Sequence, residues 1–472
     1  MASNFKTPGV YIQEIPKFPP SVAQVETAIP AFIGYTQKAQ AKDQPGDLHF
    51  VPKRITSLLE YERYYGTGIN EPGIAVKFVG EEMIATNSTP SQHNMYYALQ
   101  AFFTNGGGPC YIISTGNMSA APGGIALGTP GGAVNDGLID GLGAAATQDE
   151  ITLLVFPESQ ALSIGDYNTL MNAALLQCET LKDRFVVMDM PPPAAGQNIL
   201  DAAGTFRSSG VGPTNLKYGA AYAPNLETVF NYLFAEADVD VTLADGTTVV
   251  SLANLNPEND QPQRDAAVYN LAKRAVEAIP INLPPSPLVV GVYAAVDSSR
   301  GVWKAPANVG LIGVEKPAIH ITDATQAGLN VDTTGKSINA IRSFAGKGSL
   351  IWGARTLAGN DNEWRYVPVR RFFNMVEESV KKASEQFVFE PNDANTWVKV
   401  RAMIENFLTL QWRAGALAGA KPEDAFYVRV GLPETMTSLD ILEGRMNVEI
   451  GMAVVRPAEF IILKFSHMMQ VS

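Results

Sequence analysis

The sequence contains few of the residues that build disulfide frameworks and metal centres. Its only cysteines among 472 residues are Cys110 and Cys178, and both lie in apolar runs. This placement predicts buried free thiols, which fit a reducing compartment, and not a disulfide or a metal pair. The histidines are far apart and lack the close spacing of a zinc site. They are His49, His93, His320 and His467.

The chain also lacks a basic excess and long apolar runs. It is 46% hydrophobic and 17% charged, with a net charge of −12. Nucleic-acid binding needs a basic surface, so we expect no nucleic-acid partner. No apolar run approaches the roughly 18 residues of a membrane-spanning helix, which predicts no direct membrane insertion. The first residues show no apolar core of a secretory signal, so we expect assembly in the cytoplasm.

Catalytic motifs are missing as well, since neither G-x-S-x-G nor H-E-x-x-H occurs, and we expect no cofactor. The nearest approach is residues 330–337 (NVDTTGKS), which match the phosphate-binding loop G-x-x-x-x-G-K-[ST] except for Asn330 in place of the first glycine. The preceding residues do not read as the buried strand that such a loop follows. We therefore favour a solvated turn. Nucleotide binding through Lys336 and Ser337 is the alternative.

Pairs of carboxylates offer no better catalytic site. Glu377 and Glu378 are adjacent in a predicted helix, where a solvated helix face explains them. Asp393 follows Glu390 closely but stands where a helix N-cap is expected. Asp238, Asp240 and Asp245 match a calcium-binding loop only loosely. We therefore expect a protein that is not an enzyme.

The two ends of the chain carry the most distinctive patterns. Residues 458–465 (AEFIILKF) are apolar on both alternating faces, so a strand here needs cover on both sides. Its predicted contact residues are Phe460, Ile461, Ile462, Leu463 and Phe465. Left free at a terminus, such a strand would promote aggregation. This pattern suggests a subunit that completes its sheets with neighbouring copies.

The N-terminal end shows a matching strand pattern in residues 7–15 (TPGVYIQEI). Its predicted contact residues are Thr7, Pro8, Gly9, Val10, Tyr11, Ile12 and Ile15. Residues 1–20 lack helical periodicity, and an extended arm of this length reaches roughly 60 Å. Such an arm suits docking on another subunit. An edge strand on the chain's own sheet is the alternative.

Between the ends, the patterns predict an α/β body of the size expected for two to four domains. Two continuous apolar runs, 151–156 and 184–189, flank an amphipathic helix at 167–181, which indicates a parallel βαβ unit. Turn residues at 244–246 predict a β-hairpin that interrupts this pattern as a surface insertion. Further strands are expected at 29–35, 110–114, 218–222, 350–352 and 425–430. Helices are expected at 55–65, 95–103, 369–384 and 394–418, and a hairpin at 447–465.

Several segments resemble, in the same order, those of contractile tail sheath proteins. Near the N-terminus these are residues 7–15 and 29–35 (IPAFIGY). Later segments are 301–308 (GVWKAPAN), 338–342 (INAIR), 350–357 (LIWGARTL), 364–371 (WRYVPVRR), 389–392 (FEPN), 412–417 (WRAGAL) and 457–460 (PAEF). Residues 20–27 (PSVAQVET) look more like the sheaths of phage-tail-like injection particles. The region 118–284 matches weakly, as expected of the outward-facing part of a sheath.

The resemblance implies a structural subunit that stacks as six-membered rings around an inner tube and contracts without nucleotide. Its partners would be its own copies, the tube protein, and baseplate and terminal cap proteins. The particle would be released outside the cell or anchored to a membrane. Terminal strands would be exchanged between subunits, with hinges at the linkers. These hinge residues would be Pro16, Pro19, Pro20 and Pro457.

The resemblance also implies a domain division. We expect an arm at 1–21, an outer α/β body with a mixed sheet and the inserted hairpin at 22–360, and an α+β inner domain at 361–472. The sheet of the inner domain would be completed by neighbouring terminal strands. The family places a helix before the final hairpin near the tube. The tube-facing candidates are accordingly Thr437, Asp440, Glu443 and Arg445. An ordinary binding module, which would form small uniform particles, is a further alternative.

Overall fold

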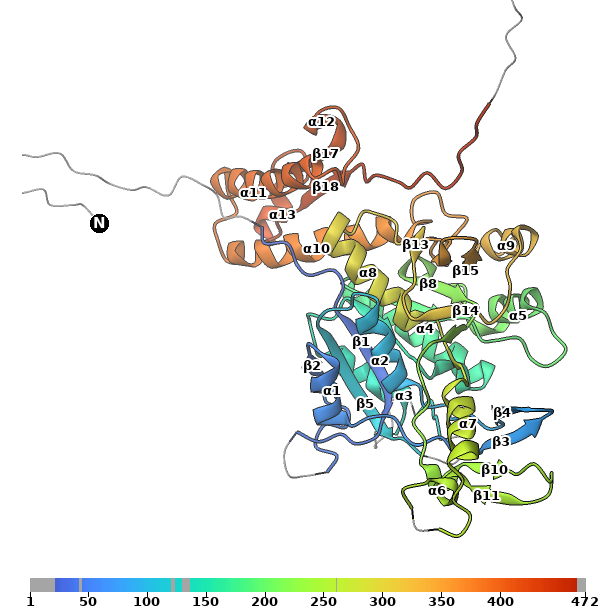
Figure 1. Ribbon diagram of the computed structural model, residues 1–472. Coiled ribbons are helices and arrows are strands. Elements are labelled where there is room, and N and C mark those ends of the chain that lie inside the picture. Colours follow the sequence, from blue (N-terminus) through green and yellow to red (C-terminus); the bar gives the residue numbers. More distant parts are fainter. Residues whose placement is uncertain (1–21, 42–44, 120–123, 130–135, 260, 465–472) are drawn as a thin grey trace, which may run out of the picture. The chain divides into compact units, whose positions relative to one another are not determined.

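A computed structural model describes residues 22–41, 45–119, 124–129, 136–259 and 261–464. These residues form two compact units (Figure 1). Unit 1 contains residues 22–24 and Glu378–Val455, and unit 2 contains Val25–Glu377 and residues 456–464. The predicted N-terminal strand residues, together with Pro16, Pro19, Pro20 and Phe465, lie outside the described residues.

Unit 2 is built on a nine-stranded mixed sheet. In spatial order the strands are β13 (Val309–Gly310), β16 (Gly348–Ile351), β15 (Ile338–Phe344), β8 (Gly219–Ala223), β7 (Phe185–Asp189), β6 (Leu153–Val155), β1 (Pro30–Thr36), β5 (Cys110–Asn117) and β2 (Lys53–Ile55). The strands from β15 to β5 run parallel, and the outer ones are antiparallel. The predicted mixed α/β body is confirmed at this level.

Strand β1 shows why the central strands are apolar throughout. All its residues are buried, and alternate side chains enter different cores. Ala31 and Ile33 face the core under α3 (Leu138–Ala145), α4 (Ile164–Leu181) and α5 (Ile199–Thr205). Phe32 faces the core under α1 (Leu58–Tyr65), α2 (Met95–Thr104) and α8 (Ser286–Arg300). Helices on both faces leave no polar side to the sheet.

Local signals set the ends of several helices. Helix α1 begins after Ser57, whose hydroxyl accepts a hydrogen bond from the Glu60 amide, and ends at Gly66 with φ of 79°. Helix α4 begins after Ser163, which caps the Asp166 amide. These residues confirm the two helices expected from the pattern, and the βαβ unit of β6, α4 and β7 is confirmed with them.

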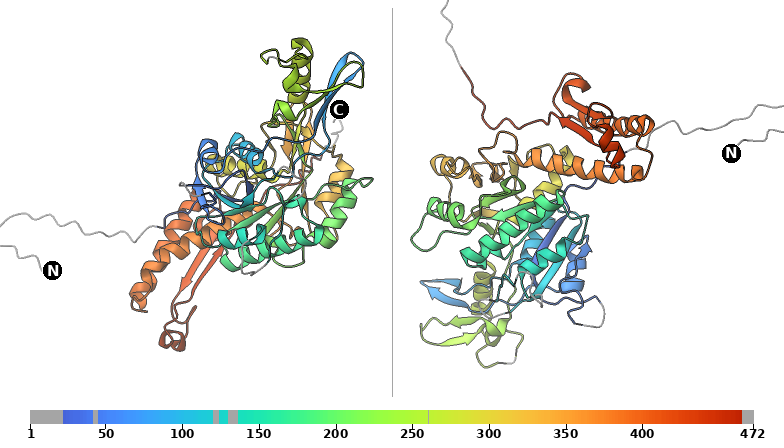
Figure 2. Two further views of the ribbon diagram at one scale, coloured as in Figure 1. Left: turned by 90° about the horizontal axis from the view of Figure 1, so that it is seen from below. Right: turned by 180° about the vertical axis from the view of Figure 1, so that it is seen from behind.

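A smaller four-stranded sheet forms a lobe of unit 2. Its order is β11 (Val249–Ser251), β10 (Asp240–Thr242), β3 (Ile74–Val79) and β4 (Glu82–Asn87). The predicted hairpin is present as β10–β11, and it joins β3 and β4 in one sheet. Strand β10 pairs in parallel with β3, and both hairpins share a core with α6 (Leu252–Leu255) and α7 (Ala266–Glu277). Figure 2 shows the two hairpins side by side.

The remaining elements of unit 2 are short connections. A three-stranded sheet has the order β12 (Ile281–Leu283), β9 (Leu226–Thr228) and β14 (Val314–Pro317), and α9 spans Asp323–Asn330. Helix α10 (Val367–Ser384) contains a boundary between the units. Single 3₁₀ or π turns occur at Ser159–Ala161, Phe206–Gly210, Leu216–Tyr218, Glu236–Asp238 and Glu385–Phe387. No helix in the described ranges is long and apolar enough to cross a membrane.

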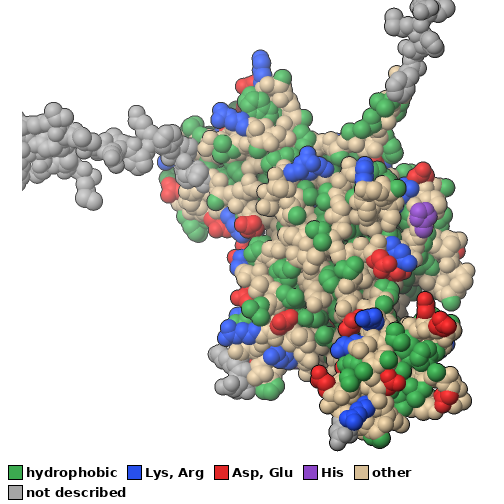
Figure 3. Space-filling view, in the orientation of Figure 1, with side chains coloured by type: hydrophobic (Ala, Val, Ile, Leu, Met, Phe, Trp, Pro, Cys, Tyr) green, Lys and Arg blue, Asp and Glu red, His purple; other side chains and the backbone are tan. Residues whose placement is uncertain are grey.

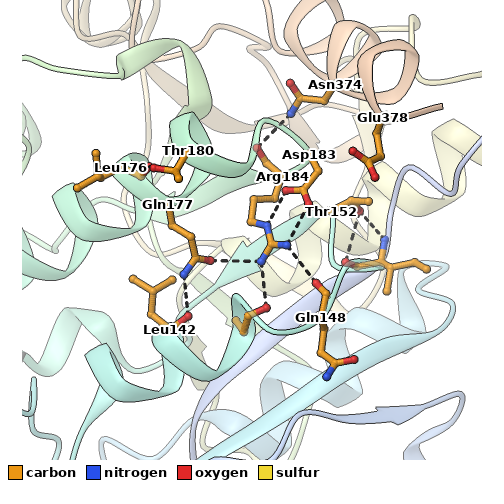
Figure 4. A network of polar contacts seen from close by, with 12 residues as sticks. Leu142, Gln148, Thr152, Leu176, Gln177, Thr180, Asp183, Arg184, Asn374 and Glu378 are labelled. Carbon is orange, nitrogen blue, oxygen red and sulfur yellow. Dashed lines mark hydrogen bonds and ion pairs between the residues drawn. The ribbon is translucent and has the colours of Figure 1, made fainter. Parts of the chain in front are cut away.

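A fully buried arginine connects the helices of unit 2 to strand β7. Arg184 forms an ion pair with Asp183 at 2.7 Å between Nε and Oδ1. Its guanidinium also donates to the carbonyl oxygens of Ala145 and Gln148, each at 3.0 Å (Figure 4). The charge is thus paired and hydrogen-bonded, as burial requires.

Unit 1 contains α11 (Ala394–Arg413), α12 (Pro422–Ala425), α13 (Ser438–Leu442), β17 (Phe426–Val430) and β18 (Val448–Met452). The predicted hairpin at 447–465 is wrong. Strand β18 pairs with β17, and residues 456–464 form no strand. Residues 431–447 connect β17 to β18 and bring these two strands together. Strand β18 is therefore already paired before the chain reaches residues 456–464.

Candidate assembly interface

The sheet of unit 1 has two strands and two outer edges. Within the described residues β17 and β18 pair only with each other, from Phe426 opposite Met452 to Val430 opposite Val448. Isolated two-stranded ribbons have marginal stability, and edge strands present backbone groups to further strands. This sheet is therefore suited to accept strands from another chain.

One face of this ribbon is packed and the other is polar. Val428 and Val430 are buried, and β17 lies against α11. Tyr427 points outward and donates to Glu449 at 2.8 Å. The predicted apolar face of α11 is confirmed, and its buried residues include Val400, Ile404, Phe407, Leu408 and Gln411. The helix ends at Arg413, earlier than expected.

The C-terminal stretch that the sequence singled out is uncovered in this chain. Phe460, Ile461, Ile462 and Leu463 are 69%, 79%, 80% and 72% exposed. In Figure 3, hydrophobic atoms dominate the segment that leads to the grey terminal residues at the upper right. A run of four exposed large apolar residues needs an occupant that the described chain does not supply.

The linker before this stretch lies at a unit boundary. The backbone amide of Val455 donates to the Ala416 carbonyl at 3.1 Å, and the boundary falls between Val455 and Arg456. Pro457 follows within the linker. Its role as a hinge stays a prediction.

The tube-facing candidates surround α13. Thr437 and Asp440 form a capping box at the helix start. Arg445 pairs with Asp440 at 3.0 Å and also contacts Glu443. Hydrogen bonds from the Thr437 hydroxyl, the Thr437 amide and the Arg445 guanidinium, the first having the largest effect, lower the pKa of Asp440. These polar groups therefore bond within their own segment.

The same segment exposes apolar surface that the sequence analysis did not single out. Leu439 and Leu442 of α13 are 57% and 83% exposed. Their positions three residues apart place them on neighbouring parts of the helix surface. The spacing of these two leucines was the sequence signal that could have identified this apolar surface.

The near-match to a phosphate-binding loop has no free ammonium. Lys336 is buried, and its Nζ donates to the carbonyl oxygens of Arg207 and Val211, each at 2.5 Å. Burial lowers the pKa of Lys336. The loop follows helix α9 and precedes strand β15, the reverse of the order in phosphate-binding loops. The geometry contradicts the nucleotide-binding alternative.

Other chemical candidates also have structural roles. Asp393 caps α11 by accepting from the amides of Asn395 and Thr396. Glu377 pairs with Arg370 at 2.8 Å, whereas Glu378, expected on a solvated face, is only 5% exposed. Cys110 and Cys178 are buried free thiols, as predicted, and burial raises the pKa of both. The described ranges contain no group of three or more metal-ligating side chains.

Comparison with known proteins gives consistent matches. The family model for the phage tail sheath C-terminal domain matches residues 359–467. A chain of the PVC sheath complex, an extracellular contractile injection system in its contracted state, has 31% identity and a TM-score of 0.65 over 98% of both chains. The contracted helical sheath of the anti-feeding prophage (AFP) has 31% identity and a TM-score of 0.62, covering 98% of this chain and 99% of that chain.

The match to a phage sheath is more limited. The tail sheath protein of Burkholderia phage BcepMu is 28% identical over 199 residues, covering 40% of this chain and 41% of the phage protein. The alignment therefore spans less than half of that relative. The similarity to the PVC chain extends over nearly its full length at 31% identity. The chain belongs to the contractile tail sheath family, a structural and non-enzymatic family of phage tails and injection-system particles.

Proposed function

We propose that this chain polymerises as stacked six-membered rings around an inner tube and contracts to drive the tube through a target envelope. Its partners are its own copies, the tube protein, and baseplate and terminal cap proteins. The particle assembles in the bacterial cytoplasm and acts extracellularly or from a membrane anchor. Related structures described as contracted sheaths and as an AFP baseplate support this proposal.

One observation supports the proposal most directly: the same chain has a two-stranded sheet with outer edges and an uncovered apolar stretch. The β17–β18 ribbon has two outer edges, and the exposed stretch Phe460 to Leu463 is apolar throughout, as expected of a strand that becomes covered on both faces. Each backbone hydrogen bond that an added strand forms contributes about 0.5–1.5 kcal/mol net. Burial of its apolar side chains adds about 25 cal/mol per Å². A few residues per strand thus suffice to connect subunits when the contact is repeated through a polymer.

The N-terminal arm supplies the second exchanged strand through the residues from Thr7 to Ile15. The linkers with Pro16, Pro19, Pro20 and Pro457 allow the globular units to rotate while the strands stay paired. The extended polymer stores free energy at assembly, so that contraction needs no nucleotide. The segment around α13, including the exposed Leu439 and Leu442, faces the tube.

Electron microscopy of the purified chain tests this function. We expect wild-type protein to form tubes with sixfold symmetry. Ile462→Asp places a charge in a strand that becomes covered on both faces and should abolish the tubes while leaving the subunit folded. Leu59→Asp is the matched control, because Leu59 on α1 is 76% exposed and Ile462 is 80% exposed.

The control variant should assemble at the wild-type yield. Wild-type tubes from the Ile462→Asp variant, with a normal thermal transition, would overturn the strand-exchange mechanism. Uniform small particles from wild-type protein, even in the presence of tube and baseplate proteins, would favour an ordinary binding module.

A further inference from the structure

The exposed C-terminal stretch begins directly after a residue that is held firmly. The Glu459 carboxylate accepts two-pronged hydrogen bonds from Arg355, at 2.7 Å from Nη2 and 3.0 Å from Nε. Asn330 Nδ2 donates to Oε1 at 2.8 Å, and the Tyr366 hydroxyl donates to Oε2 at 3.2 Å. All four residues belong to unit 2. Both carboxylate oxygens are therefore engaged by one unit.

The guanidinium that holds Glu459 is itself fixed. Arg355 is 5% exposed, and its backbone amide and carbonyl bond to the side chain of Asn339, each at 2.8 Å. Its backbone also bridges to Tyr366. Loss of the Glu459 carboxylate would leave a buried cation without its counter-charge, which is costly. The contact between Arg355 and Glu459 is thus a partly buried, hydrogen-bonded ion pair and not a surface ion pair; we call it the anchor.

The anchor divides the C-terminal segment into two parts. Within the described residues, the last backbone hydrogen bond to unit 1 is formed by Val455, and four residues later Glu459 is bound to unit 2. The exposure of Phe460, at 69%, contrasts with the 20% exposure of the Glu459 side chain. The free part therefore starts at Phe460.

We propose that Glu459 is a positioning residue that roots the C-terminal arm on unit 2, so that the arm moves with the nine-stranded sheet while it pairs with unit 1 of a neighbouring copy. This inference rests on the proposed strand exchange. The anchor sets which residues are free to reach the neighbour. It also transmits a displacement of unit 2 to that neighbour without slack in the linker.

The loop at residues 330–337, the near-match to a phosphate-binding loop, supports this anchor. Asn330, which bonds Glu459, ends α9 and starts that loop. Arg207 donates to the carbonyl oxygens of Leu329 at 2.7 Å and Lys336 at 3.0 Å, and so fixes both ends of the loop. The buried Lys336 ammonium adds further bonds. These bonds hold Asn330 in position for the arm.

The start of the described chain is rooted on unit 2 in a similar way. Arg371 is 4% exposed, pairs with Asp297 at 2.5 Å and donates to the Thr27 carbonyl at 2.8 Å. The Thr27 hydroxyl donates to Asp297 at 2.6 Å. Two buried arginines, Arg371 and Arg355, thus hold the described chain near its two ends. Arg355 binds Glu459, which directly precedes the exposed apolar stretch.

A nitroxide label at position 458 tests the anchor directly. Ala458 is exposed, while the native Cys110 and Cys178 are buried and will not react in the folded protein. We expect an Ala458→Cys label to be immobile in the purified chain and several-fold more mobile when Glu459→Gln is added. A label at Lys464→Cys, beyond the anchor, should be mobile in both backgrounds.

Assembly tests the consequence. Glu459→Gln leaves Arg355 without its counter-charge, so it should lower the thermal transition of the subunit while the protein still folds, and it should reduce tube yield at least tenfold in electron micrographs. The pair Arg355→Met with Glu459→Met removes both charges, and should fold but also fail to assemble, because charge balance without the bond gives no anchor. An immobile label in Glu459→Gln, or tubes at wild-type yield from either variant, would overturn the proposal. If wild-type protein forms no tubes, the proposed function fails, but the label still decides whether the anchor exists.

Discussion

At the scale of single residues, this chain uses buried cations as structural bonds. Lys336 and Arg184 are both buried, and both donate to backbone carbonyl oxygens of segments far away in sequence. A buried charged side chain can serve either catalysis or structure, so residue type and burial alone do not distinguish the two roles. The geometry separates them, since each donor already has its acceptors.

Replacing Lys336 should therefore affect stability and not nucleotide chemistry. Lys336→Ala leaves the carbonyls of Arg207 and Val211 without their partner, which should lower the free energy of unfolding by about 1–3 kcal/mol. Urea denaturation measures this loss. Lys347→Ala, at an exposed turn, is the control and should change little. Unchanged stability together with loss of a measurable ATPase would contradict this interpretation.

Replacing Arg184 should lower the free energy of unfolding more than replacing Lys336 does. Arg184→Met leaves Asp183 as a buried carboxylate without its cation and breaks the bonds to the α3 region, so the free energy of unfolding should fall by about 3–5 kcal/mol. Denaturation of this variant beside Arg274→Met, whose arginine is exposed on α7, measures the difference. Equal stability of the two variants would show that the network in Figure 4 contributes little.

At the scale of elements, the C-terminal segment combines a fixed root with an exposed apolar stretch. Burial alone would raise the pKa of Glu459, but the hydrogen bonds from Arg355 and Asn330 outweigh it, and the pKa lies below the usual 4.5. A carboxylate with a lowered pKa in the folded state stabilises the fold above its unfolded pKa. That contribution is lost as the pH falls through the lower folded value.

The lowered pKa of Glu459 predicts the pH range in which its carboxylate stays bound to Arg355. The label at position 458 should remain immobile from neutral pH down to about pH 5, where carboxylates are still ionised. It should become mobile only when the pH falls below 4.5, the usual value for a glutamate. In the Glu459→Gln background its mobility should not depend on pH. A transition near neutral pH would point to a different titrating group.

At the scale of the whole molecule, the two units and the two termini have separate tasks in the proposed mechanism. Unit 2 has a deep core on both faces of its large sheet, whereas unit 1 offers a two-stranded ribbon with outer edges. Under the proposed mechanism, such a subunit would fold alone and gain its last strands in the polymer. Folding and assembly should therefore be separable by deletion.

Deletion of residues 1–15 should leave a folded subunit that does not form tubes, because in the proposed mechanism the arm pairs with a neighbouring copy. Circular dichroism checks folding, and electron microscopy checks assembly. Deletion of residues 1–6, which retains Thr7 to Ile15, is the matched control and should assemble. Tubes of wild-type length from the larger deletion would refute the role of the arm.

Local sequence patterns predicted much of unit 2. The apolar runs of β6 and β7 and the helix between them have short-range signals, and Gly66 marks a helix end. The β3–β4 hairpin was not predicted, because β4 alternates between exposed and partly exposed residues. Its sheet is completed by β10, far along the chain, and no local pattern encodes such a pairing.

The sequence likewise predicted some residues of the candidate assembly interface and missed others. The apolar residues on both faces of the predicted strand, Phe460 to Leu463, identified the exposed stretch, and the family-like segments identified the sheath. The partner of β18 was predicted wrongly, because a strand pattern does not specify which of two neighbouring strands it joins. Glu459 went unnoticed as an anchor, although it is the only acidic residue between Pro457 and Leu463.

The sequence by itself determined the class of protein, the continuous apolar strands and the two unusual ends, because these depend on residue type and short-range periodicity. Only the tertiary structure decided what the polar residues do. It placed Lys336 among carbonyl oxygens and Glu459 on Arg355, contacts between residues distant in the chain. A side chain's partners depend on how the backbone brings distant segments together, and that information is not carried by any one stretch of sequence.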